Sequence, residues 1–325
     1  MRLFRKQFSA LCAVAAIAVL AMPASAQNAP QKIPYPVKVV TLVTHSSPGA
    51  GSDVFLRELV RYLQKYVNAT FIVENDEGGS GAKAVSRVAS ARPDGSMLYA
   101  SSPTYILTSL LSKPANTYRD LEPMANFFTD SEVIYVRAES SIKTVKDLID
   151  RAKTTRGRWG AANPGSLERQ AAEQLKIAAK VNAAVVSHEG GGDMMINVLN
   201  GTLDMGVGEM EEIRAQYEAK KIRVIATFNG ERIPALSDMP TVKESGYNVV
   251  LVKFRGIAGP KNLPPAITKI WDDVAQKILA DPDYQKVYNA EHLSPHFIGH
   301  EQYGPFIAKF AADTGAYLKS TGVIR

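Results

Sequence analysis

The segment 45–53 holds the residues of this chain that are best placed to do chemistry, because it is rich in glycine and serine. It follows an apolar run typical of a buried strand, 37–43, and precedes an amphipathic run typical of a helix, 54–63. Backbone N–H groups converge at such a turn and favour an anion. We therefore predict an anion cradle formed by Ser46, Ser47, Gly49, Ala50, Gly51, Ser52 and Asp53.

Four further glycine- or serine-rich turns follow predicted strands, at 77–81, 101–104, 163–166 and 188–193. In open α/β sheets, ligands bind at the carboxyl ends of strands, where such turns gather. One turn of this kind is ordinary loop punctuation, but five in one chain indicate a cleft. The contacts that we expect from these turns come from Gly79, Ser80, Ser101, Thr104, Asn163, Gly165, Ser166 and His188.

Arg169 begins a predicted helix directly after the 163–166 turn. It either pairs with Glu173 one helical turn away or binds a ligand carboxylate through two parallel hydrogen bonds. Lys253 and Arg255 lie at the end of a predicted return strand, 249–254, and one of them could reach the cleft.

An acidic group follows the strand near residue 205 and consists of Glu209, Glu211 and Glu212. Acidic residues usually gather at a helix N-terminus because the helix dipole favours them there. The alternative is that one of them receives an amine or hydroxyl of a ligand, and Glu209 is our candidate for that contact.

Catalytic and cofactor motifs do not account for these residues. The 49–53 turn lacks the third glycine of a dinucleotide-binding turn and has no phosphate-binding lysine after it, although a plain tight turn stays possible. No G-x-S-x-G sequence occurs, and His45 and His188 lack the spacing of a metal site. We expect no enzyme activity, no metal and no cofactor, with an exported hydrolase as the less favoured alternative.

The order of elements indicates an α/β fold with parallel sheets covered on both faces. The predicted strands are 37–43, 71–73, 97–100, 133–136, 185–186, 203–205, 224–226 and 249–254. The predicted helices are 54–63, 82–90, 107–111, 145–153, 169–179, 194–199, 211–220, 265–280, 284–290 and 302–318. This alternation would place the glycine-rich turns at the ends of the strands.

The first 26 residues have the pattern of a signal peptide. Arg2, Arg5 and Lys6 precede an apolar core at 11–22, and a small-residue site then predicts cleavage between Ala26 and Gln27. The single cysteine, Cys12, lies inside this segment, so the mature chain would form no disulfide. Export without disulfides fits the bacterial periplasm.

The net charge limits the classes of partner, and the length limits the number of domains. The chain carries a net charge of +6, of which three charges belong to the predicted signal. The remaining charge is mild and no dense basic block occurs, so we expect no nucleic-acid binding. The length of 325 residues is sufficient for two domains or one large one.

The chain resembles the periplasmic substrate-binding proteins of tripartite tricarboxylate transporters, often called the Bug family. The resemblance covers essentially the whole mature chain, and its short motifs are specific through their order and spacing. They lie at 34–36, 48–53, 73–75, 78–81, 93–95, 120–123, 201–204, 234–242 and 255–260.

This resemblance implies a two-domain, periplasmic-binding-protein-like (Venus flytrap) α/β architecture with a central ligand cleft. Domain 1 would comprise 27–129 plus 250–325, and domain 2 would comprise 130–249. By resemblance, two loops of domain 1 hold a ligand carboxylate through backbone N–H groups and ordered water. The domain 2 loops would be 161–169 and 188–193.

The chain departs from the family pattern at positions that should set specificity. Ser46 stands where many members have an aromatic residue, His188 replaces a common tyrosine, and Arg169 stands where a histidine is frequent. Glu212 matches a glutamate of the subset that includes the tricarboxylate binders. Histidine and arginine in place of neutral donors favour a ligand with a second or third carboxylate.

We therefore predict a monomeric periplasmic solute-binding protein that captures a small di- or tricarboxylate, or an aromatic carboxylate. It would deliver this cargo to the membrane-embedded subunits of the transporter, or serve a sensor kinase. A binding module for phosphate or sulfate would use the same loops and is the alternative reading.

Overall fold

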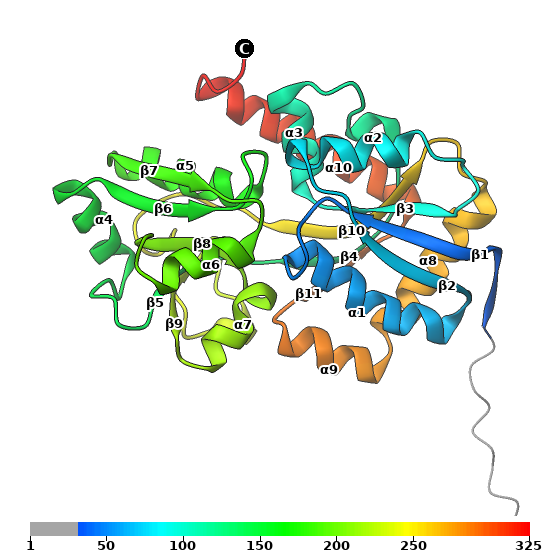
Figure 1. Cartoon of the computed structure of the whole chain (residues 1–325), viewed down its shortest axis with the longest axis horizontal. Coiled ribbons are helices and arrows are strands. Elements are labelled where there is room, and N and C mark those ends of the chain that lie inside the picture. The colour runs from blue at the N-terminus through cyan, green and yellow to red at the C-terminus, as the bar shows by residue number, and fades with distance from the viewer. Residues whose placement is uncertain (1–31) are drawn as a thin grey trace, which may run out of the picture. The chain divides into compact units, whose positions relative to one another are not determined.

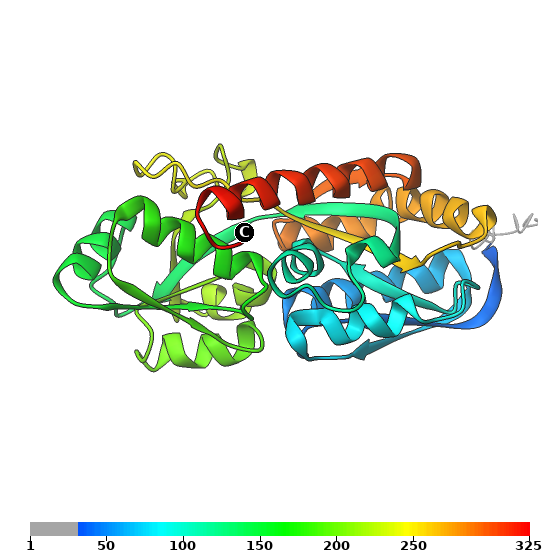
Figure 2. The same ribbon diagram turned by 90° about the horizontal axis from the view of Figure 1, so that it is seen from above.

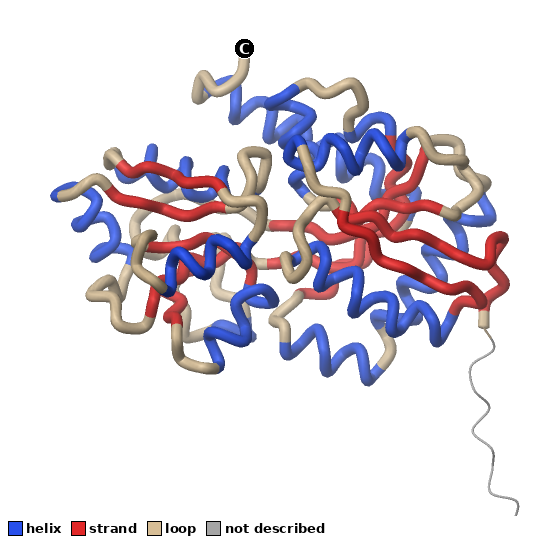
Figure 3. The backbone as a smooth tube through the Cα atoms, viewed as in Figure 1, coloured by secondary structure: helices blue, strands red, loops and turns tan. Residues whose placement is uncertain are grey.

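The computed structural model describes residues 32–325, which form one compact unit. The predicted signal peptide, its cleavage site and Cys12 lie outside the described residues. Two mixed sheets with helices on both faces make up the described chain, in agreement with the predicted α/β class (Figure 1, Figure 3). We call the first sheet with its helices lobe 1 and the second lobe 2.

The sheet of lobe 1 contains strands from both ends of the described chain. Its strands, in spatial order, are β11 (Ser294–Ile298), β4 (Leu121–Asp130), β10 (Lys253–Pro260), β3 (Met97–Ser101), β1 (Ile33–Thr44) and β2 (Val67–Asn75). Strands β1 and β2 are parallel, and their register ends at Thr44 opposite Asn75. The loops that follow these two strands therefore leave the sheet next to each other.

The helices of lobe 1 cover both faces of its sheet. They are α1 (Gly51–Tyr66), α2 (Ala82–Ala89), α3 (Pro103–Ser112), α8 (Pro265–Leu279), α9 (Pro282–Ala290) and α10 (His300–Ser320). The buried residues Phe55, Leu59 and Leu63 of α1 recur at helical spacing and pack with Trp271 of α8 on one face. Helices α2, α3 and α10 supply the core on the other face.

Lobe 2 repeats this arrangement with a smaller sheet. Its strands are β7 (Ala183–Ser187), β6 (Gly157–Ala161), β8 (Met205–Glu209), β5 (Glu132–Arg137) and β9 (Ile222–Thr227). Its helices are α4 (Val145–Thr154), α5 (Leu167–Ala179), α6 (Gly191–Leu199) and α7 (Met210–Glu218). Helices α4 and α5 pack on one face with Trp159, while α6 and α7 pack on the other.

The chain crosses between the lobes at two places that lie close together. Strand β4 ends at Asp130 and β5 begins at Glu132, so one residue separates the two sheets. The return passes through 228–252, which include the short 3₁₀ turn Pro234–Leu236, into β10. Figure 2 shows these crossing segments between the two groups of helices.

The prediction of parallel sheets is wrong for the strands at the crossing and for β11, which runs antiparallel to β4. Strand β10 runs antiparallel to β3 and β4, and β5 runs antiparallel to β8 and β9. The physical reason is that a chain arriving from the other lobe enters the sheet from the end where its neighbours leave. Strands β1, β2 and β3 are parallel, as are β6, β7 and β8.

Three strands escaped the sequence pattern, namely β4, β6 and β11. Strand β6 contains Gly157 and Gly160, and β11 contains Pro295, residues that are depleted in strands. The predicted strand 249–254 begins only at Lys253 in the structure. The predicted helix 107–111 starts earlier, at Pro103, because proline is favoured in the first turn.

Candidate functional site

Within residues 32–325, five helices begin at one small cavity between the lobes. They are α1 and α3 of lobe 1 and α5, α6 and α7 of lobe 2, and each places a first-turn residue in the wall. The space that remains is about 20 Å³, room for the centre of roughly one water molecule. The lining residues are His45, Ser46, Ala50, Gly51, Ser52, Thr104, Ala162, Asn163, Ser166, Glu168, Glu189, Gly190, Gly191, Glu212 and Lys253.

Four of these five described helices have no side-chain cap. The N-cap residues of α1, α3, α6 and α7 make no side-chain hydrogen bond, whereas Ser166 accepts one from the Arg169 N–H at the start of α5. The first N–H groups of a helix carry a partial positive charge and need acceptors. Uncapped helix ends that face one cavity therefore make an environment that favours an anion.

A carboxylate of the protein itself already lies at this position. The Gly51 N–H of α1 donates a hydrogen bond of 2.6 Å to Glu212 Oε1, which comes from the opposite lobe. A Cβ on Gly191, the first residue of α6, would lie 2.5 Å from Glu212 Oε2. The Glu212 carboxylate therefore lies between the N-termini of α1 and α6, and a side chain at Gly191 would collide with it.

His45 forms part of the cavity wall in a neutral state. Its buried ring lies with Nδ1 2.9 Å from the Tyr99 hydroxyl. Burial, reinforced by the positive charge of Lys253, lowers the His45 pKa to about 4. Gly81, whose φ is +95°, lies against this ring, since a Cβ there would come within 3.0 Å of His45 Cβ. His45 can therefore accept or donate a hydrogen bond without adding charge.

A buried network of charges lies beneath the cavity, where the chain crosses between the lobes. The ammonium of Lys253 lies 2.9 Å from Glu168 Oε1 and 3.4 Å from Glu132 Oε1, and it also contacts Glu209. The oxygens of these three glutamates lie close enough together to hold a metal ion. Lys253 supplies the positive charge there instead.

Arg255 makes the second part of this network. Its guanidinium donates to Asp130 Oδ2 at 2.7 and 3.0 Å, and it contacts Glu211 as well. Desolvation disfavours a buried charge, but the Glu211 and Asp130 carboxylates overcome that penalty and raise the pKa of Arg255. The arginine therefore stays charged and joins β10, β4 and α7.

The glutamates of the network differ in their ionisation. Burial raises the pKa values of Glu132 and Glu211 well above the ordinary value, and burial with the charge of Glu168 raises the pKa of Glu212 to about 8. Burial also opposes ionisation of Glu168, but the Lys253 ammonium and its hydrogen bond lower the Glu168 pKa. Between Glu168 and Glu212, the surroundings therefore favour the ionised form of Glu168 and the protonated form of Glu212.

Seven of the predicted site residues lie in the cavity wall: Ser46, Ala50, Gly51, Ser52, Thr104, Asn163 and Ser166. Ser47 lies just beside it, since a Cβ on Gly190 would approach Ser47 Oγ to 2.1 Å. Asp53 instead holds the loop in shape, because its carboxylate accepts hydrogen bonds from the Gly49 N–H and from Asn75. Ligand contact by each of these residues stays a prediction.

The second predicted loop of lobe 1 lies next to the cavity without lining it. The Ser80 carbonyl accepts a 2.6 Å hydrogen bond from Thr108. A Cβ on Gly165 of lobe 2 would come within 3.0 Å of Ser80 Cβ, so this loop meets the opposite lobe directly. Gly79 belongs to the same 3₁₀ turn, and the Ser101 hydroxyl pairs with that of Tyr303.

Arg169, His188 and Glu209 have protein partners in this conformation. The Arg169 guanidinium donates to Glu173 at 2.7 Å and also to the Val185 carbonyl and the Ser187 hydroxyl. The His188 ring nitrogens lie 3.3 Å from the Ala161 carbonyl oxygen and 3.4 Å from Asn197 Nδ2. Glu209 contacts Lys253. The predicted role of these residues with a ligand would require them to exchange these partners.

Glu168 and Glu189 were not named as contacts, although both lie in the predicted domain 2 loops 161–169 and 188–193, and Lys253 was expected only as one of two residues that could reach the cleft. Glu168 stands in the first turn of α5, where an acidic residue reads as an ordinary helix start. The signal that could have identified Glu168 is its position two residues after the 163–166 turn, which was predicted to line the cleft.

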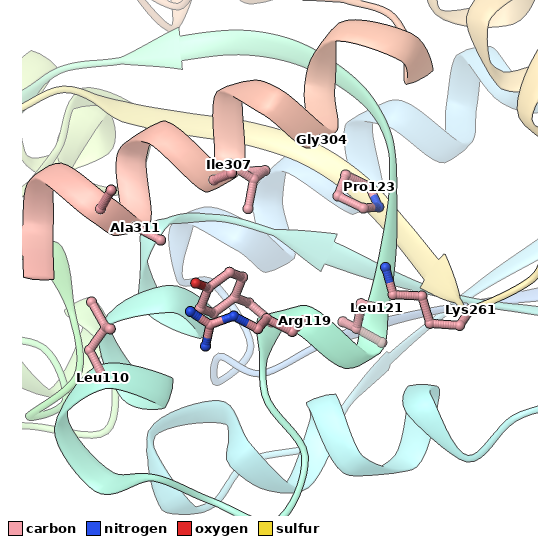
Figure 4. A pocket seen from close by; sticks show the side chains of 11 residues that line it. Leu110, Arg119, Leu121, Pro123, Lys261, Gly304, Ile307 and Ala311 are labelled. Atoms are coloured by element: carbon pink, nitrogen blue, oxygen red, sulfur yellow. The ribbon is translucent and has the colours of Figure 1, made fainter.

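A separate groove of about 390 Å³ lies on lobe 1 (Figure 4). It is bordered by α10 residues such as Ile307 and Ala311 and by the cations Arg119 and Lys261. The Arg119 guanidinium lies over the Tyr118 ring at 4.7 Å from its centroid. The wall of this groove contains none of the predicted site residues.

None of the helices within residues 32–325 combines the length and the apolar character that a membrane span requires.

Two α/β lobes, joined by crossing strands and enclosing a cavity at converging helix N-termini, define a two-domain solute-binding protein. The chain belongs to the tripartite tricarboxylate transporter receptor family, whose model matches residues 55–323. It is 26% identical over 316 residues to the UPF0065 protein in the gbd 5' region of Cupriavidus necator, covering 96% of this chain and 95% of that protein.

Solved structures show the same fold at low sequence identity. The periplasmic binding protein BugD superposes with a TM-score of 0.83 at 22% identity, covering 89% of this chain and 99% of BugD. An R. palustris protein solved with adipate superposes with a TM-score of 0.83 at 21% identity, again covering 89% of this chain and 99% of that protein. These comparisons agree with the predicted family and architecture.

Proposed function

We propose that this receptor captures a small organic acid in the cavity between its lobes and holds a ligand carboxylate at the N-termini of α1 and α6. The observation that carries this proposal is the Glu212 carboxylate, which lies on the Gly51 N–H and against Gly191. The Gly51 N–H already donates to one carboxyl group and acts to lower its pKa, against the opposing effects of burial and of Glu168, so it can donate to a ligand carboxylate in its place.

The ligand enters when the lobes separate. The cavity of about 20 Å³ is too small for any organic acid, so binding requires an opening movement. The two crossings, at 130–132 and just before Lys253, are the short segments in which a hinge can absorb this movement. In this proposal, the ligand carboxylate displaces that of Glu212 as the cleft closes again.

The setting of this function is the bacterial periplasm, supported by the signal-like pattern at 1–26. The receptor acts there as a monomer without catalysis and delivers its ligand to the membrane subunits of a tripartite tricarboxylate transporter. Its domains are 27–129 plus 250–325 and 130–249. The two sheets support this division to within one residue, since β4 of the first sheet ends at Asp130 and β5 of the second begins at Glu132.

The test is a thermal-shift screen of protein purified from the periplasm of an expressing bacterium, with its N-terminus read by mass spectrometry. The panel contains mono-, di-, tri- and aromatic carboxylates, with phosphate and sulfate as competing oxyanions. A ligand at 100 times its Kd adds about 2.7 kcal/mol, which corresponds to a rise in Tm on the order of 5 °C. Stabilisation by phosphate or sulfate but by no carboxylate contradicts the proposal.

A matched pair of glycine variants locates the carboxylate. A methyl group at Gly191 would lie 2.5 Å from Glu212 Oε2, whereas Gly192 has no atom within 4 Å. We expect Gly191→Ala to weaken carboxylate binding at least tenfold and Gly192→Ala to leave it unchanged. Equal affinities for the two variants would place the carboxylate elsewhere.

A further inference from the structure

A second small cavity lies in lobe 2, at the end of its sheet away from the crossing. Strand β5 begins beside the crossing and ends at Arg137, and β8 begins directly after Asp204. The cavity between these elements and α4 measures about 80 Å³, room for several water molecules or one small ion. Its polar lining residues are Arg137, Ser140, Ser141, Arg151 and Asp204, none of which lines the cavity between the lobes.

Among the described residues that line this cavity, one is an acid, Asp204, and both of its oxygens already have protein donors. Its Oδ1 accepts a 3.1 Å hydrogen bond from Arg151 Nε, and its Oδ2 accepts one of 2.8 Å from the Arg158 backbone N–H. The Arg158 guanidinium lies 3.7 Å from Oδ1 as well. A cationic ligand would have to compete with these two arginines for Asp204.

Arginine side chains also occupy backbone carbonyl groups around the cavity. Arg223 donates hydrogen bonds of 3.0 and 3.3 Å to the carbonyl oxygens of Ala138 and Ile142. Arg158 Nη2 donates one of 3.2 Å to the Gly201 carbonyl oxygen. These contacts fix the two loops that border the cavity, and they use acceptors that a ligand rich in hydrogen-bond donors would need.

Arg137 is the donor that remains. Within residues 32–325, its guanidinium makes no hydrogen bond or ion pair, and neither does the Ser141 hydroxyl. Gly201, whose φ is +79°, leaves room for this guanidinium, since a Cβ there would lie 2.6 Å from Arg137 Nη1. Arg151 keeps Nη1 unused, because its contacts with Asp204 are made by Nε and Nη2.

The unused groups of this wall are therefore donors, and its charge is positive. The guanidinium groups of Arg137, Arg151 and Arg158 face the single carboxylate of Asp204. Water alone ordinarily satisfies one exposed guanidinium, but an anion in this cavity gains from several donors at once. Guanidinium groups bind oxyanions through parallel, charge-assisted hydrogen bonds.

We propose that this lobe 2 cavity binds a tetrahedral oxyanion, phosphate or sulfate. Arg137 supplies the forked contact, and Arg151 Nη1 and the serine hydroxyls supply the remaining donors. The same chemistry fits a free ion and the phosphate of a lipid headgroup. This site is separate from the carboxylate site of the proposed function, because the two cavities share no lining residue.

Isothermal titration calorimetry with inorganic phosphate and with sulfate tests the free ion as the source. The buffer contains neither anion and has a low ionic strength, because salt screens exposed charges. We expect one oxyanion per protein and at least tenfold weaker binding by Arg137→Gln. Arg156→Gln, which removes an exposed charge between α4 and β6 outside the lining, should bind like the original protein. Equal affinities of Arg137→Gln and the original protein overturn the inference.

Sedimentation with lipid vesicles tests the headgroup as the source. Vesicles of phosphatidylglycerol are compared with vesicles of phosphatidylcholine, which carry no net charge. Sedimentation with phosphatidylglycerol that is lost in Arg137→Gln and kept in Arg156→Gln identifies the lipid phosphate as the group that is bound. The absence of binding in both the calorimetry and the sedimentation overturns the inference.

The variants also separate this site from the cavity between the lobes. Arg137→Gln should bind the carboxylates of the screen as the original protein does, and Gly191→Ala should keep its affinity for phosphate. Phosphate binding that is lost in Gly191→Ala places the oxyanion between the lobes and overturns the inference. Ser141→Ala is the second variant, should Arg137→Gln fold poorly, and should weaken phosphate binding severalfold.

Discussion

Glu212 should make the stability of the ligand-free receptor depend on pH. Its carboxyl group accepts the Gly51 N–H in the closed cavity, and burial together with the charge of Glu168 raises its pKa from 4.5 to about 8. In the unfolded chain this group ionises near its ordinary pKa, so the folded state binds an extra proton between these pH values. The contribution to stability is fully present below pH 4.5 and is lost as the pH rises to about 8.

The magnitude follows from the two pKa values. A shift of one pKa unit corresponds to about 1.4 kcal/mol of stability. The stability that is lost between about pH 5 and 8 is therefore at most roughly 4 kcal/mol. Glutamine is a neutral substitute that keeps an oxygen for the Gly51 N–H. We therefore expect the unfolding free energy of Glu212→Gln to increase relative to that of the original protein as the pH rises. This difference should stop growing above about pH 8.

Urea unfolding at a series of pH values measures this effect. The quantity to compare is the difference in unfolding free energy between Glu212→Gln and the original protein, because other buried acids change both alike. Glu218→Gln, an exposed glutamate of the same helix, should show no pH-dependent difference. Parallel curves for Glu212→Gln and the original protein would refute the reasoning, since they would mean that Glu212 ionises normally in the folded state.

Three further substitutions test separate parts of the framework. Arg255→Met should lower the unfolding free energy by about 3–5 kcal/mol, because it leaves the Asp130 and Glu211 carboxyl groups buried without their cation. Chemical denaturation measures this loss, and a loss below about 1 kcal/mol would contradict the prediction. Ser166→Ala should cost about 1 kcal/mol, because it removes the cap of α5, measured in the same way. Asp53→Asn should weaken ligand binding, because the Gly49 N–H and Arg57 lose their charged acceptor. Calorimetry with the carboxylate that binds most tightly in the screen measures this change. Unchanged affinity would show that the loop holds its shape without that charge.

Much of the fold could be predicted because its signals are local. The apolar spacing in 54–63 and the glycine-rich 45–53 segment indicated a strand, a turn and a helix, and β1, the loop and α1 follow in that order. The strands β4 and β6 could not be predicted in this way, because their proline and glycine residues oppose strand formation in isolation. Pairing with a neighbouring strand on each side overrides that local preference.

The candidate site likewise has parts that could be predicted from the sequence and parts that could not. The turns were identifiable because five glycine- or serine-rich turns follow strands in one chain, and ligands of open α/β sheets bind at the carboxyl ends of strands. Asp53 was predicted as part of the anion cradle, and Arg169 as a partner of either Glu173 or a ligand. The sequence could not decide the role of either residue, because each has a nearby partner of opposite charge, Arg57 for Asp53 and Glu173 for Arg169. Whether such a residue meets its neighbour or a ligand depends on where the other elements pack.

The sequence by itself determined the family, the α/β class and the loops that form the cavity, because short motifs, local spacing and turn chemistry carry that information. Only the tertiary structure decided how the charges are distributed around the anion cradle. Glu132, Glu168, Glu209 and Lys253 are far apart along the chain, and they meet because the chain crosses between the lobes beside α5 and α7. The same crossing places the Glu212 carboxylate on the Gly51 N–H, 161 residues away in the sequence.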